Sequence, residues 1–154
     1  MSSSKLVIAI DPGAKAGAAL FVNKQLVDYQ TAEGNRFESL NAVISNMLLP
    51  YSSISVNERM AVIEDGFFGK FLKGSGTLYM RRGLCQAVAE NNDIFFHEFV
   101  QPATWQNKLF GPHKGQNTKD LSRAFVKKTY KKDLLNTDIC DSICIGHWFL
   151  NHGV

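Results

Sequence analysis

Two short runs in the sequence consist only of apolar residues, and each run ends at an acidic residue. The first run is Leu6–Ile10, followed by Asp11, and the second is Met60–Ile63, followed by Glu64. A strand without polar alternation is buried on both faces, so both runs belong in the middle of a sheet that helices cover. We therefore predict an α/β fold in which the two acids mark the ends of two central strands.

The rest of the hydrophobic pattern predicts three more strands and a set of helices around the sheet. The polar pair Asn23-Lys24 between two strand-like segments is typical of a hairpin, so the chain opens with an antiparallel three-strand meander. Two parallel strands complete a five-stranded mixed sheet flanked by helices. The further strands are predicted at 17–22, 25–29 and 94–100, and the helices at 37–48, 77–90, 102–109, from an N-cap at Thr118, and from an N-cap at Asn136 or Thr137.

Composition restricts the classes of protein that the chain can belong to. With 154 residues, 45% of them hydrophobic, residues 1–154 are expected to form a single domain with a substantial core. No apolar stretch approaches the roughly 20 residues of a membrane helix, and the start does not resemble a signal peptide, so we expect a cytoplasmic protein without a membrane partner. Cys85, Cys140 and Cys144 lack the spacing of a zinc site and are expected to be reduced core residues.

The formal net charge of +3 is distributed unevenly along the chain. Between His113 and Lys132, seven basic residues face only one acid, Asp120, which gives a local charge of +6. A solvated helix face is the ordinary explanation of such a run, and a nucleic-acid contact is the alternative.

Four acids form the candidate chemical site. Asp138 and Asp141 are three residues apart at the start of the last predicted helix, so they share one face of it. If that helix crosses the two central strands, this face lies next to the strand-end acids Asp11 and Glu64. Taken singly, each acid has an ordinary structural explanation as a turn former, a surface residue or a favourable charge at a helix N-terminus. Carboxylates without a histidine or thiolate cluster favour Mg²⁺, with Mn²⁺ as a substitute.

The sequence resembles the RuvC family of Holliday junction resolvases, which belongs to the RNase H-like superfamily, and its Thr104-Trp105 pair is more similar to virus- or phage-encoded members. The resemblance implies that Asp11, Glu64, Asp138 and Asp141 are the catalytic metal ligands, with two Mg²⁺ ions per active site. It also implies a homodimer that makes paired symmetric nicks in four-way DNA junctions. The matching segments are IAIDPG (Ile8–Gly13), AVIEDGFFGK (Ala61–Lys70), RRGLCQAVAENN (Arg81–Asn92), PATWQNKLFG (Pro102–Gly111) and DICDSICIGHW (Asp138–Trp148).

The resemblance also implies which residues contact DNA. Lys119 matches a catalytic lysine of the family, whereas the position of a second family lysine holds Gln106, with Lys108 nearby. Phe67 matches a phenylalanine near the junction centre, although Phe67 or Phe68 could instead fill the core or a dimer interface, and Arg82 could pair with a neighbouring helix. The full predicted DNA-binding set is Phe67, Lys70, Lys73, Arg81, Arg82, Lys108, Lys114, Lys119 and Arg123.

Other functions remain open on the sequence. Within the superfamily, the main alternative is a broader branched-DNA or RNA-processing nuclease, and a more remote one is a catalytically silent junction-binding module, although all four acids are present. An actin-like ATPase or sugar kinase would need two such domains and a second phosphate loop, so no nucleotide cofactor is expected.

Overall fold

The computed structural model describes residues 5–65 and 75–153, and its centre is a five-stranded sheet in the order β3-β2-β1-β4-β5. The first three strands form an antiparallel meander, and β1 pairs with β4, and β4 with β5, in parallel. This arrangement confirms the predicted mixed sheet, and it makes the two apolar strands direct neighbours. The strands are β1 (Leu6–Asp11), β2 (Lys15–Val22), β3 (Gln25–Glu33), β4 (Arg59–Glu64) and β5 (Phe95–Val100).

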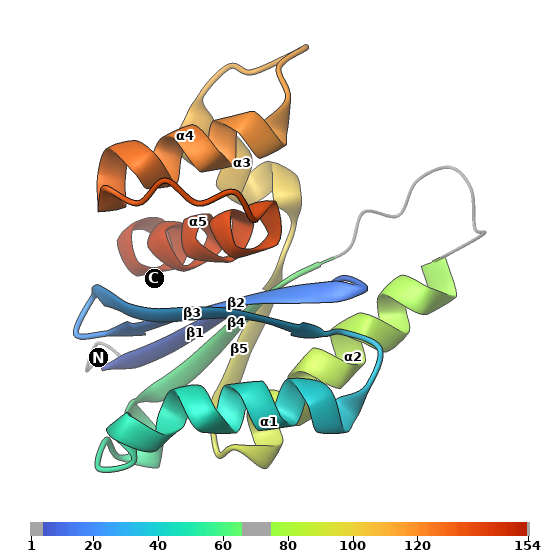
Figure 1. The fold of residues 1–154 in the computed structure, drawn as a ribbon, viewed down its shortest axis with the longest axis vertical. Coiled ribbons are helices and arrows are strands. Elements are labelled where there is room, and N and C mark those ends of the chain that lie inside the picture. Colours follow the sequence, from blue (N-terminus) through green and yellow to red (C-terminus); the bar gives the residue numbers. More distant parts are fainter. Residues whose placement is uncertain (1–4, 66–74, 154) are drawn as a thin grey trace.

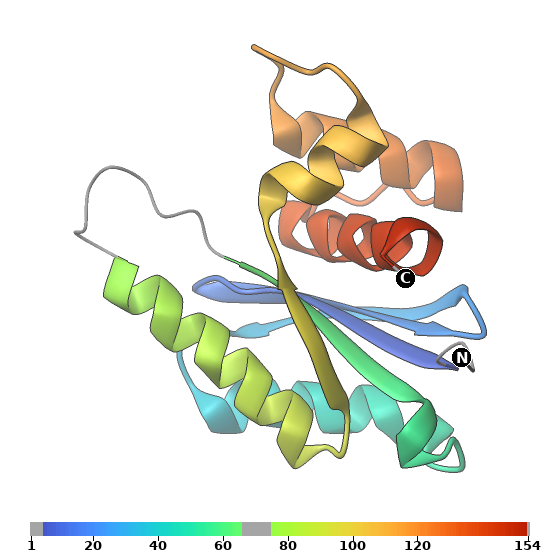
Figure 2. The same cartoon turned by 180° about the vertical axis from the view of Figure 1, so that it is seen from behind.

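Helices cover both faces of the sheet (Figure 1). Helices α1 (Phe37–Leu48) and α2 (Ser75–Asn91) pack on one face, and α3 (Pro102–Phe110), α4 (Thr118–Tyr130) and α5 (Thr137–His152) lie on the other. Seen from behind, α5 lies directly on the sheet and α4 lies outside it (Figure 2). Two short 3-10 helices, η1 (Leu49–Tyr51) and η2 (Val56–Glu58), lead into β4.

Strand alternation decides which face each central acid points to. In β1, the even-numbered residues belong to the core beneath α1 and α2, and Val7 and Ala9 belong to the core beneath α3, α4 and α5. In β4, Val62 belongs to that second core as well. Because side chains alternate along a strand, Asp11 follows Ala9 and Glu64 follows Val62 onto the face that α5 covers.

The meander is longer than the sequence pattern predicts. The β2–β3 ladder extends from Val22↔Gln25 at the hairpin to Lys15↔Glu33, so β2 begins two residues earlier and β3 ends four residues later than expected. The hairpin itself is confirmed, because Asn23 and Lys24 both have positive φ, at 49° and 67°, as a two-residue turn of this kind requires. Pairing with β2 extends β3 beyond the residues whose apolar alternation predicted a strand.

The predicted N-cap of α4 is wrong by one residue. Asn117, not Thr118, precedes the helix, and its Oδ1 accepts hydrogen bonds from the backbone N–H groups of Lys119 and Asp120, at 2.9 and 3.4 Å. Both residue types cap helices well, so the choice depends on where the preceding loop ends. At α5 the cap is Asn136, one of the two predicted positions, and its Oδ1 accepts a hydrogen bond from the backbone nitrogen of Ile139 at 3.1 Å.

The three cysteines are buried and free, which confirms their prediction as reduced core residues. Within the described part of the chain, no helix is both long enough and apolar enough to cross a membrane.

Two glycines allow α5 to approach the sheet closely. A Cβ atom on Gly17 of β2 would lie 2.1 Å from the backbone oxygen of Asp138, and one on Gly146 of α5 would lie 2.2 Å from the ring of Phe21. Neither position has room for a methyl group. The first turn of α5, which carries Asp138, is thereby held against the end of β2 that pairs with Asp11.

Gly17→Ala should therefore lower the stability of the protein, because the added methyl group must push the backbone at Asp138 away from the sheet. We expect a cost of about 1–3 kcal/mol, which lowers the melting temperature by about 2–12 °C for a chain of this size. Gly83→Ala is the matched control, since a Cβ there meets nothing within 4 Å and alanine favours the exposed helix. Equal melting temperatures for the two variants would contradict the close approach.

Candidate active site

The carboxyl ends of β1 and β4 place Asp11 and Glu64 side by side. Ile10 and Ile63 are the last residue pair of the parallel ladder, and each acid directly follows its member of that pair. Asp11 is 7% exposed and Glu64 is half-buried. Open α/β sheets bind ligands at the carboxyl ends of parallel strands, so the two acids occupy a place suited to chemistry.

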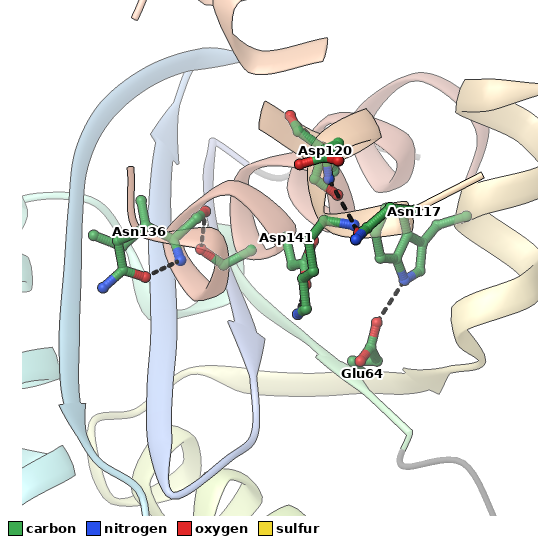
Figure 3. Close-up of polar contacts among 11 residues, drawn as sticks. Glu64, Asn117, Asp120, Asn136 and Asp141 are labelled. Carbon is green, nitrogen blue, oxygen red and sulfur yellow. Dashed lines mark hydrogen bonds and ion pairs between the residues drawn. The ribbon is translucent and has the colours of Figure 1, made fainter. Parts of the chain in front are cut away.

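The first turns of α5 bring the other two acids to the same edge. Asp141 is 7% exposed and Asp138 is half-buried, and the Asn136 cap fixes where the helix begins (Figure 3). The negative charges of Glu64, Asp141 and Asp138 all act on Asp11. The structure thus brings together the four acids that the sequence analysis selected.

Burial and mutual repulsion make the charged forms of the central acids unfavourable. Burial raises the pKa of Asp11 well above its ordinary value of 3.8, and the charges of Glu64 and Asp141 raise it further. Burial also raises the pKa of Glu64, to about 7, although a hydrogen bond from Trp105 opposes this shift. A cation placed among these carboxylates would remove the repulsion.

Lys119 supplies a positive charge to this cluster. Its Nζ donates a hydrogen bond to Oδ2 of Asp141 at 2.6 Å. Partial burial opposes the charged ammonium, but the hydrogen bond and the charges of Asp141 and Asp11 outweigh it, so the pKa of Lys119 is raised. The lysine is therefore a cation at neutral pH, positioned beside the acids by the first turn of α4.

Trp105 is a site residue to which the sequence analysis gave no role. The indole is fully buried, and its Nε1–H donates a hydrogen bond to Oε2 of Glu64 at 2.7 Å (Figure 3). Its ring packs edge-on against Phe110, with 5.7 Å between ring centroids. The only available sequence signal was the Pro102 segment itself, because the two partners are 41 residues apart.

The donor set of the cluster fits a hard divalent cation, since it consists of carboxylates without a thiolate or imidazole. Within residues 5–65 and 75–153, however, no three histidine, cysteine, aspartate or glutamate side chains are arranged to hold a metal ion as they stand. Two of the acids already have hydrogen-bond partners, because Asp141 is held by Lys119 and Glu64 by Trp105.

The predicted DNA-binding residues lie in different surroundings. Lys108 and Lys114 are exposed, on α3 and in the loop before α4. Arg123 donates to the backbone oxygen of Leu134 at 3.1 Å and lies 3.8 Å from Asp133. Phe67, Lys70 and Lys73 fall outside the described residues.

The two arginines of α2 are held by neighbouring side chains. Arg81 donates to Oδ1 of Asn35 at 2.7 Å. Arg82 forms an ion pair with Asp65, and its guanidinium lies over the rings of Tyr79 and Phe99. These contacts favour a structural role for Arg82, although its ion-pair partner follows β4 and is not on a neighbouring helix as the sequence alternative supposed.

Comparison with solved structures identifies the fold. RuvC of Thermus thermophilus in complex with a Holliday junction substrate has a TM-score of 0.69 at 14% identity, covering 96% of this chain and 92% of that chain. Another T. thermophilus RuvC structure gives 0.68 at 16% identity, with 96% and 93% covered. The yeast mitochondrial Holliday junction resolvase Ydc2 gives 0.53 at 12% identity, with 97% and 79% covered.

No protein-family model and no curated protein sequence matches the chain. At these identities the structural similarity establishes the fold, and the chain has the α/β fold of RuvC. The fold that the sequence resemblance implied is confirmed.

The raised pKa of Glu64 predicts how stability varies with pH in buffer without divalent cations. Between its ordinary value of 4.5 and about 7, the folded protein holds a proton that the unfolded chain has lost. The free energy of unfolding therefore falls as pH rises through this range. Glu64→Gln should reduce the fall and raise the melting temperature at pH 8 by about 3 °C or more. Glu33→Gln, at an exposed position of β3, is the control, and a lower melting temperature for Glu64→Gln would show that the carboxylate is structural.

Trp105→Phe should raise the pKa of Glu64 further, because it removes the hydrogen bond that stabilises the carboxylate. We expect the decline in stability to extend to higher pH, because it begins at the unchanged pKa of the unfolded chain and ends at the pKa of the folded protein. Thermal melting between pH 4 and pH 9 measures this. Trp148→Phe is the control, since Trp148 belongs to the same core. An unchanged pH profile in Trp105→Phe would mean that the hydrogen bond does not form in solution.

Proposed function

We propose that the protein is a metal-dependent endonuclease that hydrolyses phosphodiester bonds in branched DNA, with the four-way Holliday junction as its main substrate. The observation that carries the proposal is the convergence of the four acids, with Lys119, at the carboxyl ends of β1 and β4. The shared fold with RuvC and with Ydc2 supports the choice of substrate.

Two Mg²⁺ ions, for which Mn²⁺ would substitute, would be held by the four acids of the cluster: Asp11, Glu64, Asp138 and Asp141. When bound, such ions lower the pKa of water and stabilise the charge that develops on a phosphoryl group. Trp105 orients Glu64 through its indole N–H, and the burial of Asp11 keeps its carboxylate away from bulk water. Lys119 provides a positive charge at the same place, which would offset the negative charge of the scissile phosphate in the transition state.

We propose that the protein acts as a homodimer, which would match the twofold symmetry of the proposed substrate. Two identical sites related by a twofold axis would cut two opposed strands at equivalent positions, as a paired symmetric nick requires. One copy of the chain supplies all four acids, so each protomer would carry its own active site.

Asp11→Asn should abolish cleavage and leave junction binding intact, because the acid belongs to the chemistry while basic side chains provide affinity. We expect the nicking rate in Mg²⁺ to fall by about 100-fold or more, a loss typical of removing a catalytic group. The Kd for the junction, measured without divalent cations, should change little. Asp120→Asn removes an exposed aspartate of α4 and is the charge-matched control. Nicking at the wild-type rate by Asp11→Asn would refute the proposed role of the cluster.

The substrate class is tested by comparing a four-way junction, a three-way fork, a loop, a linear duplex and an RNA–DNA hybrid, each with and without Mg²⁺. Paired symmetric nicks in the four-way junction are expected. Equal cleavage of all branched DNA would favour the broader nuclease, and preference for the hybrid would overturn the choice of DNA junctions. Binding of the junction without any cleavage would favour the silent binding module.

A further inference from the structure

The structure divides the basic run of the sequence into two groups at opposite ends of α4. Lys119 in the first turn contacts Asp141 of the candidate active site. Lys128, Lys131 and Lys132 lie at and just beyond the last turn, and these three residues are here called the distal basic surface. Twelve residues separate Lys119 from Lys131, which corresponds to about 18 Å along a helix.

The contacts of the last turn of α4 place it over the start of β1, at the opposite end of this strand from Asp11. Tyr130, the last residue of α4, packs edge-on against Phe21, with 6.3 Å between ring centroids. Phe21 pairs with Val7 near the start of β1, whereas Asp11 is at its end. The views from both sides show this end of α4 far from the ends of β1 and β4 that carry the acids (Figures 1 and 2).

The three lysines of the distal basic surface are exposed. Across the described residues, none of them forms an ion pair, whereas the neighbouring Lys127 lies 3.8 Å from Asp133. Lys131 has a φ of 59°, a left-handed conformation that glycine adopts at lower cost at the end of a helix. Its Nζ donates to the backbone oxygen of Lys128 at 2.9 Å, so the side chain of Lys131 folds back onto the last turn of the helix.

The surface offers positive charge but little for the recognition of bases. The two aromatic rings beside it are already engaged, because Tyr130 packs on Phe21 and Tyr29 lies 5.7 Å below the Nζ of Lys132. Single-stranded nucleic acid is bound largely by stacking on exposed rings, whereas a duplex is bound through its phosphates. The chemistry therefore fits the backbone of a double helix.

We propose that the distal basic surface binds the phosphate backbone of a duplex arm of the DNA substrate, about five base pairs from the bond that is cut. The spacing follows from about 18 Å of helix and 3.4 Å per base pair. This inference rests on the proposed nuclease function, and it adds a second contact region that positions an arm while the acids act at the branch.

The test removes the charge of the surface and then restores it. The triple variant Lys128→Ala, Lys131→Ala, Lys132→Ala should raise the Kd for a four-way junction with 20-base-pair arms by about tenfold or more at low salt. The slope of log K against log salt should fall by about 2.7, since each phosphate contact contributes about 0.9. In nicking assays KM should rise more than kcat falls. The triple arginine variant at the same positions should restore both affinity and salt slope.

An unchanged Kd and salt slope in the alanine variant would show a solvated helix end and overturn the proposal. If the arginine variant also loses affinity, positive charge does not determine DNA binding at these positions, and the proposal is overturned. Binding is measured without divalent cations and also on a linear 20-base-pair duplex, so the surface is tested independently of cleavage. Absence of nicking by the wild-type protein on every branched substrate would refute the proposed function instead.

A second measurement locates the contact along the arm. Uncharged methylphosphonate linkages placed about five base pairs from the cut should weaken binding by the wild-type protein and have little effect on the triple alanine variant. Equal weakening of both proteins would place the contact elsewhere and contradict the proposal.

Discussion

The arrangement of the molecule depends on burying several carboxylates next to one another. Like charges about 4 Å apart repel by about 1–4 kcal/mol per pair in surroundings between water and a protein surface, so the cluster needs compensation from the rest of the fold. Two elements provide it: α4 supplies the ammonium of Lys119, and α3 supplies the indole N–H of Trp105. The helices on this face of the sheet therefore hold the acids in place as well as covering the core.

Much of the fold could be predicted because its signals are local. An apolar run without alternation identifies a central strand wherever it occurs, and β1 and β4 both follow this rule, with Asp11 and Glu64 at their ends. The two acids of α5 were found for the same reason, since a spacing of three residues on a helix gives one face. The structure also shows which face of the sheet the strand-end acids are on, because strand alternation turns Asp11 and Glu64 toward α5.

The features that were missed depend on packing between distant segments. The hydrogen bond from Trp105 joins residues 41 apart, and no local pattern specifies its partner. Lys119 itself was selected through the family resemblance, but its ion pair with Asp141, 22 residues away, was not predicted. The length of β3 was underestimated because an edge strand is extended by its neighbour. The basic run appeared as a single feature, whereas the direction of α4 separates Lys119 from Lys131 by most of the helix.

The position of α5 has a consequence for the motions of the site. This helix lies between the sheet and α4, and every residue from Cys140 to Gly146 is buried, so its backbone amides can exchange with solvent only when the core itself opens. Asp141 is thus carried by one of the last segments to unfold, while Asp138 lies one turn earlier. The buried helix therefore fixes the backbone of Asp141, whereas Lys108 near the end of α3 and Lys114 in the loop that leads into α4 are exposed.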